Sequence, residues 1–253
     1  MTDHSGMQLG KKAVRHDPRT LKMAKYMNLA DLPMPPKTLN WGVNVRLWPM
    51  MKNNEIGDCA WASAGHLIQL WTAAKGTMYV PPDDQIVDAY SKATGYNPAD
   101  PSTDRGTVEL DALNYWRNTG IAGHKIGAYM AINLGNDGHV KTAIWMFGGI
   151  YIGLDLPVTA QNQDIWDYES KAGNNSNPGS WGGHAVPIIG YSKDTLLCVT
   201  WGEVKEMTWD FWDAYADEAY AVLGNDWIAG VRLAPSGFDL ATLQADLNAL
   251  GAE

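Results

Sequence analysis

The spacing of hydrophobic residues predicts four helices along the chain. Hydrophobic positions recur every three or four residues in 59–74, 82–96, 107–121 and 237–251, which is the spacing of one helix face. The second of these stretches begins with acidic residues and the third stops at a glycine, as helices commonly do. The stripes in the first and last stretches consist of Trp61, Ala64, Ile68 and Trp71 and of Leu240, Leu243, Leu247 and Leu250.

From residue 124 onward, short apolar runs replace most of the helical pattern. Such runs, with turn residues between them, are typical of strands. A polar stretch over 161–181, rich in Asn, Gly and Ser, is expected to be an irregular loop. We expect strands within 124–132, 148–156, 182–192, 194–202 and 219–227, and helices over 139–147 and 209–220. The second half therefore predicts an antiparallel sheet or small barrel, and the whole chain an α+β fold.

The chain divides into an arm, a body of two lobes and a terminal helix. The first segment is polar and basic and ends in a proline cluster, so we expect an extended arm that lies on the body or on a partner. Residues 18–27 within it have the pattern of a short helix. The expected units are the arm at 1–36, the body at 37–235 with lobes at about 37–123 and 124–235, and the amphipathic helix at 236–253.

Composition narrows the classes of function. The 253 residues carry a formal net charge of -9, which argues against binding nucleic acid or an anionic membrane through bulk charge. The sequence contains no apolar run long enough for a membrane span and no hydrophobic signal core at its start, so we expect synthesis in the cytoplasm. Cys59 and Cys198 are the only cysteines, and no CxxC or HExxH spacing occurs. We therefore expect no disulfide framework, no metal site and no cofactor.

Cys59 is the residue whose position best suits chemistry. It opens the first predicted helix, directly after Asp58, which is a suitable N-cap. The helix dipole and the unpaired N–H groups at that end would lower the thiol pKa from about 8.5 and favour the nucleophilic thiolate. The plain alternative is a small buried residue that packs at a helix start. Cys198, inside an apolar run, and His66, two turns along the same helix, are interpreted as structural residues.

Three motifs, in the same order, resemble those of the papain-like cysteine peptidases. The segments are PKTLNWGVNVRLWPMMKNNEIGDCAWAS with Cys59, GSWGGHAVPIIGYS with His184, and LLCVTWGEV with Trp201 and Gly202. They are similar to the family's mature start with its nucleophile, to its histidine motif and to its Asn-Ser-Trp-Gly motif. The resemblance spans roughly residues 37–235 and implies a papain-like fold, with a helical first lobe and a second lobe built on a sheet or barrel.

The resemblance implies a set of site residues. Cys59 would be the nucleophile and His184 its proton partner across the cleft between the lobes. The Cys59 N–H and Asn53, where the family has Gln, would bind the oxyanion. Val199 stands where the family has the Asn that orients the histidine, so Thr200 is the neighbouring candidate, although strand alternation would turn it to the face opposite Val199 and Trp201. The substrate-binding residues implied beside the cleft are Trp181, Gly183 and Trp201.

Three functions are compatible with these motifs. The first is a thiol hydrolase, most simply a peptidase, that acts on a peptide or protein substrate through an acyl-enzyme. The second is a catalytically weak or inactive papain-fold component of a larger assembly, such as a phage or virus particle, with the arm as its anchor. Asn53, Asp58 and Val199 motivate that second function. The third is a cysteine amidase or acyltransferase that acts on cell-wall peptides.

Overall fold

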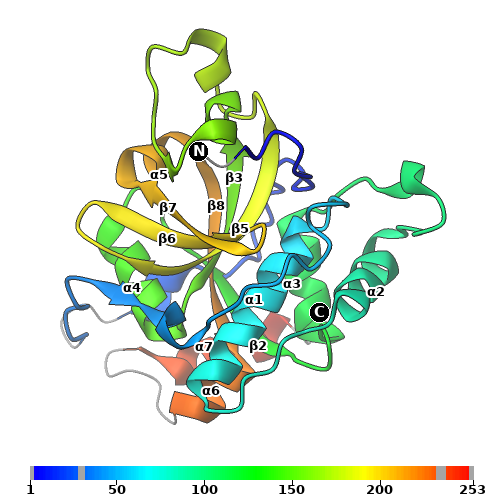
Figure 1. The fold of residues 1–253 in the computed structure, drawn as a ribbon. Coiled ribbons are helices and arrows are strands. Elements are labelled where there is room, and N and C mark those ends of the chain that lie inside the picture. The colour runs from blue at the N-terminus through cyan, green and yellow to red at the C-terminus, as the bar shows by residue number, and fades with distance from the viewer. Residues whose placement is uncertain (1–2, 28–31, 232–237, 251–253) are drawn as a thin grey trace.

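A computed structural model describes residues 3–27, 32–231 and 238–250 of the chain and has a mixed α+β fold (Figure 1). Its α-helices are α1 (Cys59–Ala74), α2 (Asp83–Thr94), α3 (Glu109–Asn118), α4 (Asp137–Phe147), α5 (Trp209–Tyr215), α6 (Asn225–Val231) and α7 (Leu240–Leu250). Its strands are β1 (Leu39–Asn40), β2 (Ile126–Ala131), β3 (Ile150–Leu156), β4 (Ile165–Trp166), β5 (Gly182–Tyr191), β6 (Thr195–Thr200), β7 (Glu203–Thr208) and β8 (Ala216–Gly224). Helices α1, α2 and α3 gather on one side of the strands (Figure 1).

The strands form one sheet in the order β2-β8-β3-β5-β6-β7-β4, and β1 pairs with β5 outside this path. Neighbouring strands are antiparallel, except that β4 and β7 are parallel. The antiparallel sheet predicted for the second half of the chain is therefore confirmed. Strand β5 lies near the middle of the sheet, where its register with β3 places His184 opposite Leu154.

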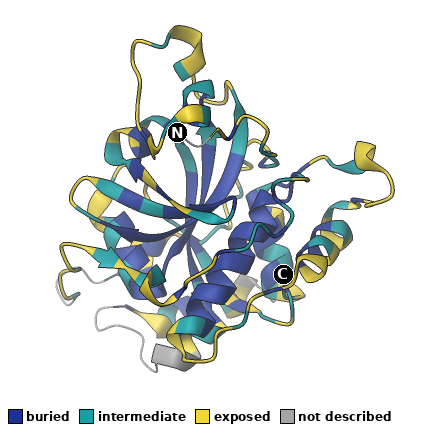
Figure 2. Cartoon of the chain, in the orientation of Figure 1, coloured by how far each residue is buried: buried dark blue, intermediate teal, exposed yellow. Residues whose placement is uncertain are grey.

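Alternate residues of the central strands pack into two separate hydrophobic cores. In β5, Val186 and Ile188 belong to a core shared with α4, whereas Ala185 and Ile189 belong to a core shared with α1. This alternation follows from the period of two in a strand. Helix α1 is buried along almost its whole length (Figure 2). The start of α1 is consequently held against one face of the sheet, close to the beginning of β5.

Most of the predicted elements are confirmed. The three helices predicted in the first half correspond to α1, α2 and α3, and the helix predicted over 139–147 corresponds to α4. The C-terminal helix is also present as α7, with Leu243 buried but Leu240 still 40% exposed. The side chain of Leu250 and the expected domain boundary at residue 235 lie outside the described residues.

Three element predictions are wrong in part. The helix expected over 209–220 ends at Tyr215, because the residues that follow pair with both β3 and β2 as strand β8. The irregular loop expected over 161–181 contains β4, which pairs with β7. The helix expected over 18–27 is reduced to a single 3-10 turn, Met23–Tyr26. Strand β7 itself has no counterpart among the predicted elements.

The N-terminal arm lies along the body over its described residues. Lys11 forms a bridge with Thr107 and Lys22 forms one with Ala131, both in parallel orientation. Figure 1 shows this dark blue segment passing beside the strands of the second lobe. Whether the arm also binds an assembly partner stays a prediction. No helix among the described residues is long and apolar enough to cross a membrane.

Candidate active site

Hydrogen bonds between α1 and the central strands fix the position of Cys59, the first residue of the helix. Ser63 Oγ donates to the Ala185 carbonyl at 2.8 Å, and the Tyr151 hydroxyl donates to the Ala60 carbonyl at 2.8 Å. The backbone N–H of Ala185 in turn donates to Cys59 Sγ at 3.4 Å. The sulfur of Cys59 therefore lies at the junction between α1 and β5.

His184 immediately precedes Ala185 on β5, one residue from the backbone N–H that reaches Cys59 Sγ. The side chain is completely buried, and a hydrogen bond of 2.8 Å joins His184 Nε2 to Thr200 Oγ1. The indole of Trp201 stacks on the imidazole, with ring centroids 4.4 Å apart and planes inclined by 19°. The other ring nitrogen, Nδ1, has no hydrogen-bond partner in the part of the chain that the structure describes. Thr200 and Trp201 thus orient the ring and leave Nδ1 uncommitted.

A turn after β6 explains how Thr200 and Trp201 both reach His184. Val199 packs toward α1, in the core on the other face of the sheet, as alternation requires. Strand β6 ends at Thr200, and Trp201 adopts a positive φ of 44°. This left-handed turn breaks the alternation, so the expectation that Thr200 and Trp201 would point to opposite faces is wrong. Thr200 occupies the orienting place that Val199 cannot fill.

Asp58 does not play the part expected of it. Although it precedes α1, its side chain accepts no hydrogen bond from the described helix backbone, so the predicted cap is wrong. The carboxyl is instead fully buried, and burial raises its pKa well above the usual value. Asn53 Nδ2 donates to the Ile56 carbonyl at 3.3 Å. The amide expected to bind an oxyanion is therefore engaged within its own turn.

Burial sets the protonation of both central side chains. It raises the pKa of Cys59 to about 12, despite hydrogen bonds from the backbone N–H groups of Ala185 and Gly10. It also lowers the pKa of His184 to about 3. The expected lowering of the thiol pKa at the helix start is therefore wrong for this arrangement, because loss of hydration outweighs the helix dipole. Around neutral pH the pair consists of a neutral thiol and a neutral imidazole.

The segment that covers Cys59 belongs to the arm. The Thr107 N–H donates to the Gly10 carbonyl at 2.7 Å, and the Lys11 N–H donates to the Gly183 carbonyl at 3.0 Å. The chain thus passes between the residues before α3 and the start of β5, directly over the sulfur. The fit is close, because a Cβ added to Gly10 would lie 1.8 Å from the carbonyl oxygen of Gly57.

The arm also contacts the aromatic side of the site. His4 is buried, and its ring stacks on Trp201 with centroids 5.2 Å apart. His4 Nε2 lies 3.0 Å from Glu203 Oε1. Trp181 lies against Trp201, with centroids 5.5 Å apart. Two of the residues predicted to bind substrate, Gly183 and Trp201, therefore contact a segment of this same chain.

The part played by the arm is what the sequence reasoning missed. The available signal was a Gly-Lys-Lys run at residues 10–12 in a basic segment that precedes an acidic body. No spacing rule relates such a run to a cysteine almost fifty residues later, so the contact could not be predicted. Cys198 and His66 have the structural surroundings expected from the sequence. Cys198 is fully buried, and His66 Nε2 lies 2.9 Å from the Pro49 carbonyl oxygen.

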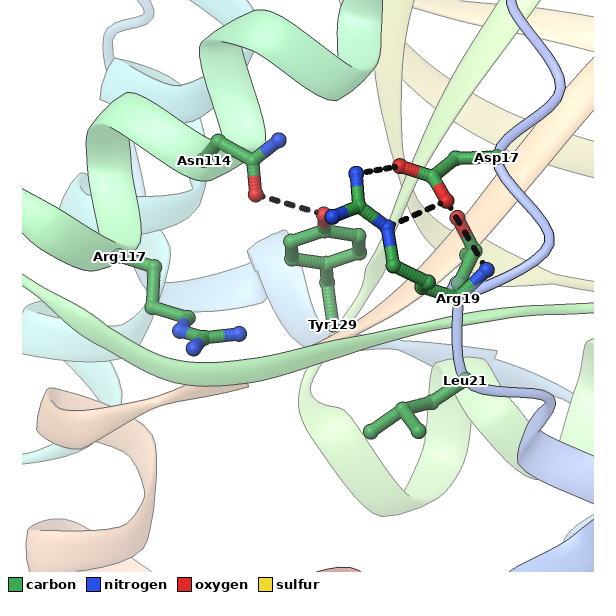
Figure 3. Close-up of a pocket in the computed structure, with 7 residues that line it drawn as sticks. Asp17, Arg19, Leu21, Asn114, Arg117 and Tyr129 are labelled. Atoms are coloured by element: carbon green, nitrogen blue, oxygen red, sulfur yellow. Dashed lines mark hydrogen bonds and ion pairs between the residues drawn. The ribbon is translucent and has the colours of Figure 1, made fainter. Parts of the chain in front are cut away.

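A separate hollow lies where the arm continues past the site. It encloses about 160 Å³ between the arm, α3 and β2. Figure 3 shows Asp17 paired with Arg19, and the Tyr129 hydroxyl directed at Asn114. Its lining contains neither cysteine nor histidine. We therefore take the junction at Cys59 as the candidate active site. Among the described residues, no three His, Cys, Asp or Glu side chains are grouped so that they could hold a metal ion.

Comparisons with known proteins bear on the fold. No protein-family profile matches the chain, and no curated protein sequence matches it. Solved structures do: xylellain, a cysteine protease from Xylella fastidiosa, has a TM-score of 0.66 at 13% identity, over 88% of this chain and 98% of that one. Procathepsin L 3 of Tenebrio molitor gives 0.55 at 12% identity, over 85% and 76%. The Carica candamarcensis cysteine protease CMS1MS2 gives 0.52 at 14% identity, over 75% and 99%. The papain-like fold predicted from the sequence is confirmed.

Proposed function

We propose that the chain is a thiol hydrolase of the peptidase type, with Cys59 as nucleophile and His184 as its proton partner, kept latent by the arm. One observation carries this proposal. Cys59 Sγ accepts a hydrogen bond from Ala185, the residue next to His184, while a peptide segment of the same chain passes over it. The papain-like fold and the protease names of the similar structures support the general class, a thiol hydrolase or peptidase.

The proposed chemistry begins when the arm leaves the site. Water then reaches the pair, and the proton of the Cys59 thiol passes to His184, because hydration and the helix dipole now favour the thiolate. The sulfur attacks the carbonyl carbon of a peptide bond, and the Cys59 N–H, with Asn53 once it is freed, donates to the oxyanion. His184 gives its proton to the departing amine as the C–N bond breaks. Water, deprotonated by His184, then hydrolyses the thioester and releases the acid.

The geometry of the arm supports a blocking role and not that of a substrate. The carbonyl oxygen of Gly10 accepts a hydrogen bond from the Thr107 N–H at 2.7 Å. An attacked carbonyl must present its carbon to the sulfur and its oxygen to the oxyanion donors. The Gly10 oxygen is bound to Thr107 instead, so the segment can remain in place without being cut.

The test uses the full-length chain with its arm loosened. Lys11→Ala removes the buried lysine that anchors the arm, and a fluorescently labelled casein reports hydrolysis. We expect turnover in this variant, none after the further change Cys59→Ser, and unchanged turnover after Cys198→Ser, the matched control. A thioester on Cys59, detected by mass after acid quenching, would support the acyl-enzyme. An unseated arm without any turnover would overturn the proposal.

The other two functions stay predictions. Val199 is part of the motive for a non-cleaving assembly component, and the hydrogen bond between His184 Nε2 and Thr200 Oγ1 weakens that motive. The three similar structures named above are proteases, and their names do not support a phage or virus role. An amidase or acyltransferase would use the same pair, and it would show itself by transferring the acyl group to an added amine.

A further inference from the structure

The arm places one lysine inside the body of the protein. The side chain of Lys11 is completely inaccessible to solvent. Its ammonium donates a hydrogen bond to Asp217 and lies 3.7 Å from Glu218 and 3.9 Å from Asp155. A buried lysine of this kind requires carboxylate partners, because an isolated ammonium in the interior would lose its hydration without compensation.

The Lys11 pocket contains more acidic side chains than one ammonium can pair with. Glu109 is fully buried, and neither of its carboxyl oxygens has a hydrogen-bond partner among the described residues. One carboxyl oxygen of Glu218 is bonded by the Tyr220 hydroxyl at 2.6 Å, and the other has no such partner in the described part of the chain. Burial raises the pKa of both glutamates, and repulsion from a neighbouring carboxylate, Glu218 for Glu109 and Asp217 for Glu218, raises it further. Once the arm leaves, these acidic groups face one another without a cation.

The pocket belongs to the body and adjoins the candidate active site. Glu109 begins α3, Asp155 lies on β3, and Asp217 and Glu218 lie near the start of β8. The carbonyl oxygen of Gly183, one residue before His184, accepts a hydrogen bond from the Lys11 N–H at 3.0 Å.

The inner wall of the pocket is formed by a glycine. A Cβ added to Gly153 would lie 2.1 Å from Lys11 Cε. The pocket therefore has an apolar passage for a methylene chain and carboxylates where that chain ends. This combination matches a long basic side chain and disfavours an acidic or a short one.

We propose that this pocket is a subsite for a lysine or arginine side chain of a peptide substrate, and that Lys11 is its internal occupant. The carboxylates of Asp217, Glu218 and Glu109 would then select basic residues beside the bond that Cys59 attacks. The role of the pocket as a substrate subsite rests on the proposed function. Binding of a basic side chain in the pocket does not, because binding requires no cleavage.

Binding to the full-length chain tests the subsite directly. The background is Lys11→Ala with Cys59→Ala, which empties the pocket and prevents turnover. The probes are the labelled peptide Leu-Gly-Lys-Lys-Ala, which is the sequence of residues 9–13, and its analogue with leucine for the first lysine. We expect the leucine analogue to bind at least about tenfold more weakly in an anisotropy titration. The same difference should disappear when Asp217→Asn and Glu218→Gln are added.

Two matched variants keep the test decisive. Lys12→Ala alters the neighbouring exposed lysine and should leave the arm seated, so neither peptide should bind. Gly10→Ala, whose added Cβ would clash with Gly57, unseats the arm by shape and should give the same peptide ranking as Lys11→Ala. Equal binding of the two peptides, or no binding by a chain whose arm has left, overturns the subsite. Selective binding without hydrolysis in a Cys59 chain would overturn the proposed function and leave the subsite standing.

Discussion

The surroundings of Cys59 and of Cys198 differ in what covers the sulfur. Both cysteines are completely buried, and burial raises the pKa of both thiols. Cys198 lies within β6, between β5 and β7, in the core of the sheet. Cys59 lies at the start of α1, beneath Gly10 of the arm. Backbone hydrogen bonds and the buried side chain of Lys11 hold the arm in this place. The first cover is the fold itself, whereas the second is the arm, which we propose leaves while the fold remains.

This difference teaches that a buried thiol is not necessarily an inert one. The high pKa of Cys59 describes the arrangement with the arm in place, because loss of hydration is its largest cause. The pKa of Cys198 has the same largest cause, but only unfolding would remove it. We therefore expect every treatment that moves the arm to make Cys59 reactive and to leave Cys198 unreactive.

The largest expected effect is on turnover. In the Lys11→Ala chain, His184→Ala should lower kcat/KM for a peptide by roughly a thousandfold, because no general base remains for Cys59. Cys198→Ala in the same chain should leave kcat/KM nearly unchanged. Steady-state hydrolysis of a fluorogenic peptide measures both. If both variants lost kcat/KM to a similar extent, the two cysteines would not differ in their importance for catalysis.

The next effect concerns pH. Because burial lowers the pKa of His184 to about 3 from 6.5, the folded chain excludes a proton that the unfolded chain binds below that ordinary value. This contribution to stability is complete above pH 6.5 and is lost as pH falls toward the folded-state pKa. Between those limits, at about pH 4.5, the free energy of unfolding should have fallen by ~3 kcal/mol more in the wild type than in His184→Asn.

Urea denaturation of both proteins, above pH 6.5 and at about pH 4.5, measures that difference in the free energy of unfolding. Cys198→Ala should follow the wild-type pH dependence, because its thiol stays protonated throughout the range. Parallel curves for the wild type and His184→Asn would show that His184 is already hydrated in the folded chain.

A smaller effect is expected at Thr200, the positioning residue for His184. Thr200→Val keeps the shape but removes the hydroxyl that bonds Nε2 at 2.8 Å, so kcat in the arm-loosened chain should fall roughly tenfold. Thr200→Ser should restore most of it, which a purely packing role would not require. Val199→Ala, on the opposite face, provides the matched control, and we expect it to change stability more than kcat.

The smallest effect separates the cysteines by packing alone. Cys198→Ala leaves a small void inside the sheet and should lower the free energy of unfolding by about 1 kcal/mol. Cys59→Ala should cost less, because the sulfur lies against the arm, whose glycine can settle closer. Paired chemical denaturation curves decide the order, and a larger loss for Cys59→Ala would contradict it.

Much of this architecture follows from local sequence. Helix α1 was predictable because its apolar residues recur at helical spacing, and β5 and β6 because their apolar runs end at turns of polar residues or glycine. Three motifs in order implied that the segment of His184 would lie near Cys59, and Ala185, the residue after His184, does donate to Cys59 Sγ. These features depend on periodicity and motif order, which a sequence displays directly.

The remainder depends on contacts between distant residues. Thr200 reaches His184 only because Trp201 adopts a left-handed conformation, which alternation in a strand does not reveal. The pKa of Cys59 depends on Gly10, and the lysine pocket collects acidic residues from α3, β3 and β8. Aspartate is a common N-cap residue, but the carboxyl of Asp58 is buried and makes no capping hydrogen bond to α1. Tertiary contact overrides local preference at each of these places.

The most direct test of the account is the rate at which iodoacetamide alkylates each cysteine of the folded chain at about pH 7. Peptide mass mapping should show Cys59 and Cys198 both protected in the wild type and in Lys12→Ala. In Lys11→Ala, the account predicts that Cys59 reacts at least about tenfold faster while Cys198 stays protected. If Cys59 remained protected after the arm had been unseated, or if both cysteines became reactive together, the arm would not be what keeps this site latent.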